Sequence, residues 1–145
     1  MDKPVVLFLC TNNAARSQMA EALLKKRAAE RFDAYSAGTE PKDIHPLTIR
    51  VMNEIGIDLS GRQAKHLRLF LGRLAVRYAI FVCRRAEEKY PITWPGALNR
   101  LEWPIEDPAA QEGSDEECLQ KFREVRDQID KRIADWLADL SIRDK

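Results

Sequence analysis

The chain has 145 residues, a net charge of +1 and 32% charged residues. This length suits one domain with a hydrophobic core, and the balanced charge makes nucleic acid or an anionic membrane surface an unexpected partner. Three cysteines, an odd number, do not form a secreted disulfide framework, and the apolar run near the N-terminus is too short for a signal peptide core or a membrane span. We therefore expect a cytoplasmic protein whose residues 1–145 form a single domain.

The first predicted element is a buried strand. Five apolar residues, from Val5 to Leu9, precede Cys10, which suggests a strand that is covered on both faces. The Ala, Glu, Leu and Met content after Ser17 favours a helix over about residues 16–31. Cys10 therefore lies where strand becomes loop, close to the N-terminus of a helix.

The later elements follow from apolar spacing and from turn residues. A glycine turn ends the second strand, Gly56 closes the second helix, and Ser114 with Glu117 forms the pattern of a capping box at the start of the last helix. The predicted strands are residues 5–10, 32–38, 78–82 and 99–103, and the predicted helices are residues 16–31, 46–55, 67–74, 84–89 and about 114 to the end.

Strands that alternate with helices predict parallel pairing through right-handed crossovers. The expected fold class is therefore α/β, with a single-domain open parallel sheet of four strands and flanking helices. In such a sheet the functional site lies at the carboxyl ends of the strands, which is where Cys10 is predicted.

The loop that begins at Cys10 has the residues of a nucleophile and of an anion cradle. A thiol near a helix N-terminus, with Arg16 six residues on and the Ser17 hydroxyl as a donor, is stabilised as a thiolate. The loop N–H groups and the planar guanidinium suit a tetrahedral oxyanion. The alternative is an unreactive buried thiol, since unpaired cysteines commonly pack as small hydrophobes. The predicted substrate-binding residues are Thr11, Asn12, Asn13, Ala14, Ala15, Arg16 and Ser17.

The Cys-x5-Arg-Ser arrangement, with Asn13 three residues after Cys10, resembles the loop shared by low-molecular-weight protein tyrosine phosphatases and thioredoxin-coupled arsenate reductases. The resemblance extends to residues 36–39, 45–46 and 54–60. One departure is Asn12, which stands where the family usually has glycine, although asparagine tolerates left-handed backbone conformations. The resemblance implies a flavodoxin-like sheet with strand order 2-1-3-4, in which Cys10 and Cys83 follow adjacent strands.

Cys83 follows the third predicted strand as Cys10 follows the first. Taken alone, it is also compatible with a buried structural thiol. Adjacent strands lie about 4.8 Å apart, so a Cys10–Cys83 disulfide is conceivable after modest loop motion, and the position resembles that of the second cysteine of the reductases. Tyr90 stands where the reductases that pass their disulfide to thioredoxin carry a third cysteine. Cys118 shares the helical spacing of the apolar residues after it and is expected on the buried face of the last helix.

Asp107, which is followed by proline, is by itself typical of a turn. The resemblance implies that Asp107 is a general acid that protonates the departing oxygen. The phosphatases have an aromatic residue just after this pair, whereas Ala109 and Ala110 resemble the reductases and imply a smaller substrate. His45 and His66 have no metal-ligand spacing, so both are expected to be loop or surface groups and no metal site is predicted.

Lys65 carries a further expectation from the resemblance. In some reductases the counterparts of Asn13, Glu21 and Ser36 bind potassium together with a carboxylate from near the Lys65 position. The resemblance implies that the ammonium group of Lys65 replaces this ion.

The resemblance implies two enzyme activities. In an arsenate reductase, Cys10 attacks arsenate, Arg16 and the loop amides hold its oxygens, Asp107 protonates the leaving oxygen, and Cys83 then forms a disulfide with Cys10 as arsenite departs. The alternative is a phosphatase in which Cys10 forms a phosphocysteine and Cys83 is passive. A third hypothesis, based on Asn12 and the missing third cysteine, is a non-catalytic oxyanion-binding or sensing module.

Arsenate reduction is the predicted function. No tightly bound cofactor is expected, and an external thiol system should regenerate the enzyme: thioredoxin, or glutaredoxin with glutathione or a similar thiol. The expected partners are therefore a small oxyanion, either arsenate or a phosphate-like group, and one of these thiol proteins. We expect a monomer.

Overall fold

A computed structural model of the chain describes residues 3–83, 94 and 96–143. These residues form a four-stranded sheet in which every neighbouring pair is parallel and the strand order is β2-β1-β3-β4. The predicted α/β fold and strand order are thus confirmed. The strands are β1 (Val5–Cys10), β2 (Asp33–Gly38), β3 (Tyr78–Phe81) and β4 (Asn99–Glu102).

Strand β1 is the centre of the hydrophobic core. The side chains of Val6, Leu7, Phe8 and Leu9 are all fully buried, as an apolar run without alternation predicts for a strand covered on both faces. The strand pairs with β2 on one side and with β3 on the other, so Cys10 is held between two neighbouring strand ends. In parallel sheets this carboxyl end is the usual place for a functional site.

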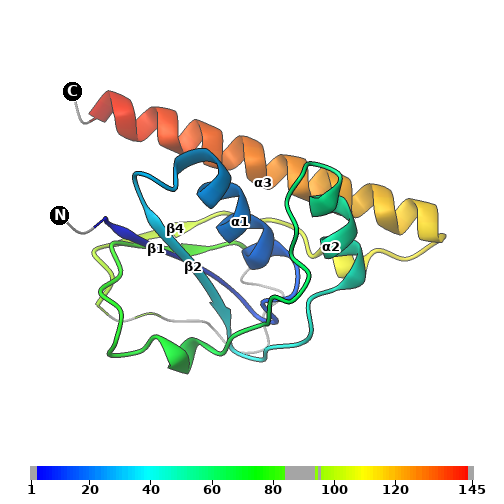
Figure 1. The fold of residues 1–145 in the computed structure, drawn as a ribbon, viewed down its shortest axis with the longest axis horizontal. Helices are drawn as coiled ribbons and strands as arrows, with labels where there is room; N and C mark the ends of the chain where they lie inside the picture. The colour runs from blue at the N-terminus through cyan, green and yellow to red at the C-terminus, as the bar shows by residue number, and fades with distance from the viewer. Residues whose placement is uncertain (1–2, 84–93, 95, 144–145) are drawn as a thin grey trace.

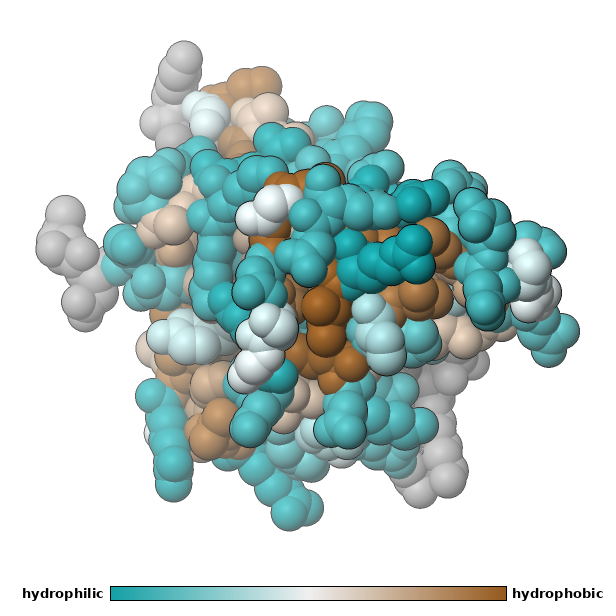
Figure 2. Space-filling view, turned by 45° about the vertical axis from the view of Figure 1, so that its right-hand side comes forward, coloured by the Kyte–Doolittle hydropathy of each residue, from teal (hydrophilic) through white to brown (hydrophobic). Residues whose placement is uncertain are grey.

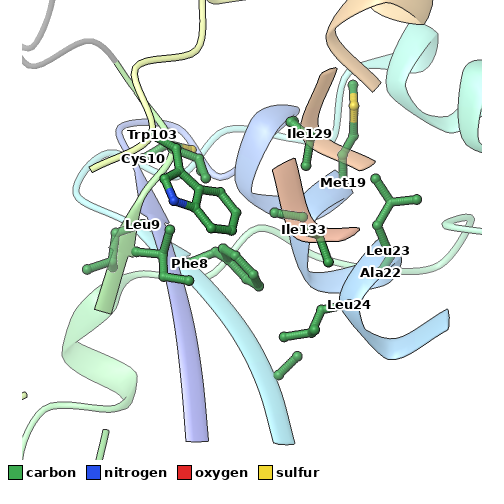
Figure 3. Close-up of a cluster of buried hydrophobic side chains, with 14 of the residues drawn as sticks. Phe8, Leu9, Cys10, Met19, Ala22, Leu23, Leu24, Trp103, Ile129 and Ile133 are labelled. Carbon is green, nitrogen blue, oxygen red and sulfur yellow. The ribbon is translucent and has the colours of Figure 1, made fainter. Parts of the chain in front are cut away.

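Three helices lie on the same side of the sheet (Figure 1). They are α1 (Arg16–Ala28), α2 (Pro46–Asn53) and α3 (Asp115–Arg143). Figure 3 shows side chains of α1, including Met19 and Leu23, packed against Ile129 and Ile133 of α3, with Phe8 of β1 below them. The long helix α3 therefore covers α1 and closes this side of the core.

The segment 67–74 differs from the predicted helix. Only Leu67–Leu69 form a helical turn, the 3-10 helix η1, and the chain then continues through turns. Gly72 adopts a φ of 73°, a left-handed conformation that terminates regular helix, and Leu69 and Leu71 are exposed rather than packed on a core face. The predicted helix 84–89 and Tyr90 lie outside the described residues.

The start of α3 agrees with its predicted capping box. The backbone N–H of Glu117 donates to Ser114 Oγ at 3.1 Å, and Ser114 N–H donates to Glu117 Oε1 at 3.3 Å. Cys118 differs from the expectation: it is only partly buried, and the neighbouring Leu119 is buried instead. The helix therefore presents Cys118 at the margin of its apolar stripe. No helix among the described residues is both long and apolar enough to cross a membrane.

Gly38, at the end of β2, allows the chain to approach the loop after β1. A Cβ atom at this position would lie 2.3 Å from the carbonyl oxygen of Thr11 and 2.9 Å from that of Cys10. Both contacts are with backbone, which cannot rotate away as a side chain could. A residue without a side chain is therefore required where β2 supports the Cys10 loop.

Candidate active site

Cys10 is the last residue of β1, and its thiol is the centre of the candidate site. The residue is 3% exposed, and α1 begins six residues later. The backbone N–H of Asn13 donates to Cys10 Sγ at 3.3 Å, and Ser17 Oγ lies 2.8 Å from the same sulfur. The short loop thus folds back over the sulfur, as the spacing between Cys10 and Ser17 predicts.

The Ser17 hydroxyl contacts both Asn13 and the Cys10 sulfur. Asn13 Nδ2 donates to Ser17 Oγ at 2.7 Å, so the oxygen serves as an acceptor on that side. The hydroxyl hydrogen is then available to Cys10 Sγ. The Asn13 N–H and the Ser17 hydroxyl thus hold the Cys10 sulfur in a defined position at the base of the loop.

The side-chain oxygen of Asn13 ties the loop to the rest of the fold. Asn13 has a φ of 51°, and its Oδ1 accepts hydrogen bonds from Gln18 Nε2 at 2.8 Å and from the backbone N–H of Lys65 at 2.9 Å. Within the described residues, Asn13 is the one non-glycine residue with positive φ, so Asn12 is not left-handed. The absence of glycine at position 12 therefore imposes no backbone strain.

Arg16 is placed as an anion ligand next to Cys10. It is 7% exposed, and its Nη1 donates to the carbonyl oxygen of Ile105 at 2.8 Å. This contact joins the first turn of α1 to the segment that carries Asp107. In the described part of the chain the other guanidinium N–H groups have no acceptor, which leaves them available for a bound oxyanion.

A pocket of about 270 Å³ opens above the Cys10 loop. Figure 2 brings forward the side of the molecule toward which β1 runs, and this face is largely hydrophilic around a small hydrophobic area. Of the predicted binding residues, Thr11, Asn13 and Ser17 are not among the described lining residues, and the last two are fully buried and support the loop from behind. The described lining residues are Cys10, Asn12, Ala14, Ala15, Arg16, Lys42, Asp43, His45, Asp107, Ala109 and Ala110.

Asp107 enters this pocket from the segment after β4. It precedes the 3-10 helix η3 (Pro108–Ala110), and its Oδ1 accepts a hydrogen bond from the backbone N–H of Ala109 at 3.0 Å. One carboxyl oxygen is thereby fixed, so the other has a defined position in the pocket. None of the described lining residues is phenylalanine, tyrosine or tryptophan, and the two residues after Pro108 on this side, Ala109 and Ala110, have small side chains.

Cys83 lies just beyond β3 and is 2% exposed. Leu9 of β1 is in register with Phe81, and Val82 N–H donates to the Leu9 carbonyl at 3.0 Å. Cys10 and Cys83 therefore follow neighbouring strands, with Cys83 one residue further along. The structure has no disulfide among the three cysteines, all of which are described.

A buried carboxylate lies behind the loop. Glu21, which is 2% exposed, accepts from Ser36 Oγ at 2.9 Å, Lys25 Nζ at 3.1 Å and Arg62 Nη1 at 2.5 Å, and Lys65 Nζ is 3.7 Å from it. The ammonium group of Lys65 thus lies beside Glu21, at the place where the resemblance implies that it replaces a potassium ion. Burial alone would raise the pKa of Glu21, but Lys65 and Lys25 with the Ser36 hydrogen bond hold it below its ordinary value.

We expect Glu21→Gln to lower the free energy of unfolding by about 2–3 kcal/mol, because three cationic side chains lose their shared carboxylate. The lowered pKa means that the contribution of Glu21 is complete above its ordinary value of 4.5 and is lost as the pH falls through the folded-state pKa. Urea unfolding at several pH values measures both effects. Glu30→Gln, at an exposed site, is the control. A Glu21→Gln curve identical to wild type at neutral pH would contradict the expected role.

Three pocket residues were not predicted from the sequence: Lys42, Asp43 and His45. His45 was expected to be a loop or surface group, but its side chain accepts from Leu47 N–H and caps α2. The available signal was the position of His45 immediately before a proline and a predicted helix. Lys42 and Asp43 lie in a loop without a pattern, and only the fold brings them to Cys10.

The fold and the thiol-centred anion loop define the class. Residues 5–145 match the model of the low molecular weight phosphotyrosine protein phosphatase family, and the chain belongs to this family. Within it, the chain is similar to an arsenate reductase of Halalkalibacterium halodurans, with 42% identity over 133 residues that cover 92% of this chain and 94% of the relative.

Solved structures show the same relationship. An arsenate reductase in the phosphate binding state superposes with a TM-score of 0.77 at 32% identity, covering 94% of this chain and 98% of the other. A thioredoxin-dependent arsenate reductase of Corynebacterium glutamicum superposes with a TM-score of 0.68 at 28% identity, covering 97% of this chain and 63% of the other. The described residues contain no cluster of histidine, cysteine and carboxylate side chains that could hold a metal ion.

Proposed function

We propose that this protein reduces arsenate to arsenite through the thiols of Cys10 and Cys83. The observation that carries the proposal is the pair of buried, reduced cysteines at the ends of the adjacent strands β1 and β3. The similarity to arsenate reductases over more than nine-tenths of the chain supports it. A phosphatase of this fold needs only the first of these thiols.

The first step is nucleophilic substitution at arsenic. The Cys10 thiolate forms a sulfur–arsenic bond, and one arsenate oxygen leaves as water after it receives a proton from Asp107. Arg16 and the loop N–H groups hold the remaining oxygens, whose negative charge they balance. No oxidation state changes in this step.

The second step transfers two electrons to arsenic. The Cys83 thiolate attacks Cys10 Sγ, the sulfur–sulfur bond forms, and the electron pair of the sulfur–arsenic bond passes to arsenic, which leaves as arsenite. The enzyme is then a Cys10–Cys83 disulfide. Cys83 lies one residue beyond the position opposite Cys10 on the neighbouring strand. A strand separation of about 4.8 Å and a rise of about 3.3 Å per residue place the Cα atoms of the two cysteines about 6 Å apart, within the range of a disulfide.

An external dithiol then returns the enzyme to its reduced form. Thioredoxin is the reductant favoured by the resemblance to a thioredoxin-dependent relative, and glutaredoxin with glutathione is the alternative. We also propose a cytoplasmic location, because the thiols of Cys10, Cys83 and Cys118 are maintained under reducing conditions. We further propose that the protein is a monomer.

The phosphatase alternative rests on the family name and on the shared Cys10 loop. Arsenite release and para-nitrophenyl phosphate hydrolysis, measured side by side with thioredoxin, with glutaredoxin plus glutathione, and without reductant, separate the two. We expect arsenite in at least one reductant and little nitrophenol release, since the described lining has no phenylalanine, tyrosine or tryptophan side chain to hold a phenyl ring. Strong hydrolysis with no arsenite under any condition would establish the phosphatase instead.

A further inference from the structure

His45 is held rigidly at the wall of the oxyanion pocket. Its backbone N–H donates to the carbonyl oxygen of Ala14, in the Cys10 loop, at 3.1 Å. Its ring Nδ1 accepts from Leu47 N–H at 3.1 Å, and the ring packs on Phe122 of α3 with a centroid separation of 4.7 Å. The imidazole therefore has one orientation, set by the loop, by α2 and by α3.

These contacts also determine where the imidazole proton resides. Because Nδ1 accepts a hydrogen bond, it carries the lone pair, and the single proton of the neutral ring must be on Nε2. Partial burial lowers the pKa of His45, although the Asp107 carboxylate opposes this shift, so the ring is neutral near pH 7. Protonation of Nδ1 would also break the cap of α2.

The Nε2–H group has no acceptor within the described part of the chain. The charged and titratable groups around the same pocket are Lys42 and Asp43 from the loop before His45, Asp107 from the opposite wall, and Cys10 with Arg16 on the floor. Asp107 is already engaged with Ala109 N–H. A donor that is fixed beside Cys10 and Arg16 without a protein acceptor has the chemistry of a ligand for a bound anion.

We propose that His45 is a further oxyanion-binding residue, whose Nε2–H donates a hydrogen bond to an oxygen of the bound tetrahedral anion. The inference rests on the oxyanion-binding role proposed above and extends it to a residue outside the Cys10 loop. A neutral donor complements the cationic Arg16, because it contributes a directional hydrogen bond without adding a second positive charge.

Two substitutions separate the cap from the donor. Asparagine places an acceptor where Nδ1 lies, and glutamine places an N–H donor near the position of Nε2. His45→Asn should keep the melting temperature and weaken phosphate binding about 10-fold, as expected for a lost hydrogen bond to a charged group. His45→Gln should bind phosphate within about 2-fold of wild type and melt about 3–5 °C lower.

His66 provides a matched control within the same chain. It also precedes a helical turn, and its Nδ1 accepts from Arg68 N–H at 3.0 Å, but it is not among the residues that line the pocket. The chain has only two histidines, so long-range proton–nitrogen spectra resolve both rings. Inorganic phosphate, which cannot be reduced by the thiols, should shift the Nε2 resonance of His45 and leave that of His66 unchanged.

The outcomes distinguish this inference from the proposed reductase activity. If phosphate shifts the backbone amides of residues 11–16 but not His45 Nε2, or if His45→Asn binds phosphate as wild type does, the inference is overturned and His45 is only a helix cap. If phosphate shifts neither, the anion pocket itself is refuted. Arsenite release is measured separately and decides the reductase activity in each case.

Discussion

Replacing Cys83 with serine is expected to abolish arsenite release, because the two electrons that reduce arsenic come from the attack of Cys83 on Cys10. The serine hydroxyl cannot attack the Cys10 sulfur, so the sulfur–arsenic adduct should accumulate. Since Cys83 does not belong to the described pocket lining, phosphate affinity should stay near that of wild type. Single- and multiple-turnover assays with each reductant measure the effect, and mass spectrometry of trapped enzyme identifies the adduct.

Cys118→Ser is the control for this experiment. Cys118 is partly exposed, and its Sγ donates to the carbonyl oxygen of Gln111 at 3.4 Å, a contact that a serine hydroxyl can replace. Its turnover should be close to wild type. If instead Cys83→Ser retains full turnover, with glutathione joined directly to Cys10, the enzyme uses one cysteine. A dominant Cys83–Cys118 disulfide in the oxidised protein would show that the start of α3 unwinds during the cycle.

Replacing Asp107 with asparagine is expected to slow the first chemical step by roughly 10²–10⁴-fold, the usual contribution of a general acid. Asparagine retains an oxygen that can accept the hydrogen bond from Ala109 N–H, so the turn should stay folded. The loss should therefore appear in the rate constant, whereas phosphate affinity and melting temperature should change little. Rapid-quench measurement of the Cys10 adduct gives this rate directly.

Asp43→Asn tests whether any carboxylate of the pocket would have the same effect. Asp43 lines the pocket with Asp107 but comes from the loop before α2. Its substitution should leave the rate within about 3-fold of wild type, because proton transfer depends on the position of the donor. A rate loss shared by both variants would point to the net charge of the pocket, and unchanged kinetics for Asp107→Asn would make Asp107 a turn residue only.

Much of the scaffold was predictable because its signals are local. The apolar run of β1, the alternation of strands with helices and the capping box at Ser114 each depend on neighbours in the sequence. The Cys10 loop is equally local, since the thiol at the end of the strand and the donors Arg16 and Ser17 at the start of the helix lie within eight residues. These signals were sufficient to predict the parallel sheet and its site, and the resemblance supplied the strand order.

The errors occurred where local patterns compete with packing. Residues 67–74 have helical composition, but the helix is limited to one turn and Gly72 adopts a left-handed conformation. Cys118 was expected on the buried face of α3, but the buried face begins one residue later, so that Leu119 is buried and Cys118 is only partly buried. At the loop, the backbone places the left-handed conformation at Asn13, one residue after the position where glycine was missing.

The sequence by itself determined the central strand, the thiol at its end, and the donors Arg16 and Ser17 at the start of the next helix. These groups are close along the chain, so any fold that contains this strand and this helix brings them together. Tertiary structure alone decided which distant groups share the pocket. His45, Lys42 and Asp43 reach Cys10 because the loop before α2 bonds to the Cys10 loop through Ala14 and Asn12. Glu21 is held by Ser36 of β2 and by Arg62 and Lys65 of the loop after α2, in addition to Lys25 of its own helix. The contacts of Lys42, Asp43 and His45 with the Cys10 loop depend on the packing of whole elements, and the spacing of residues along the chain does not predict them.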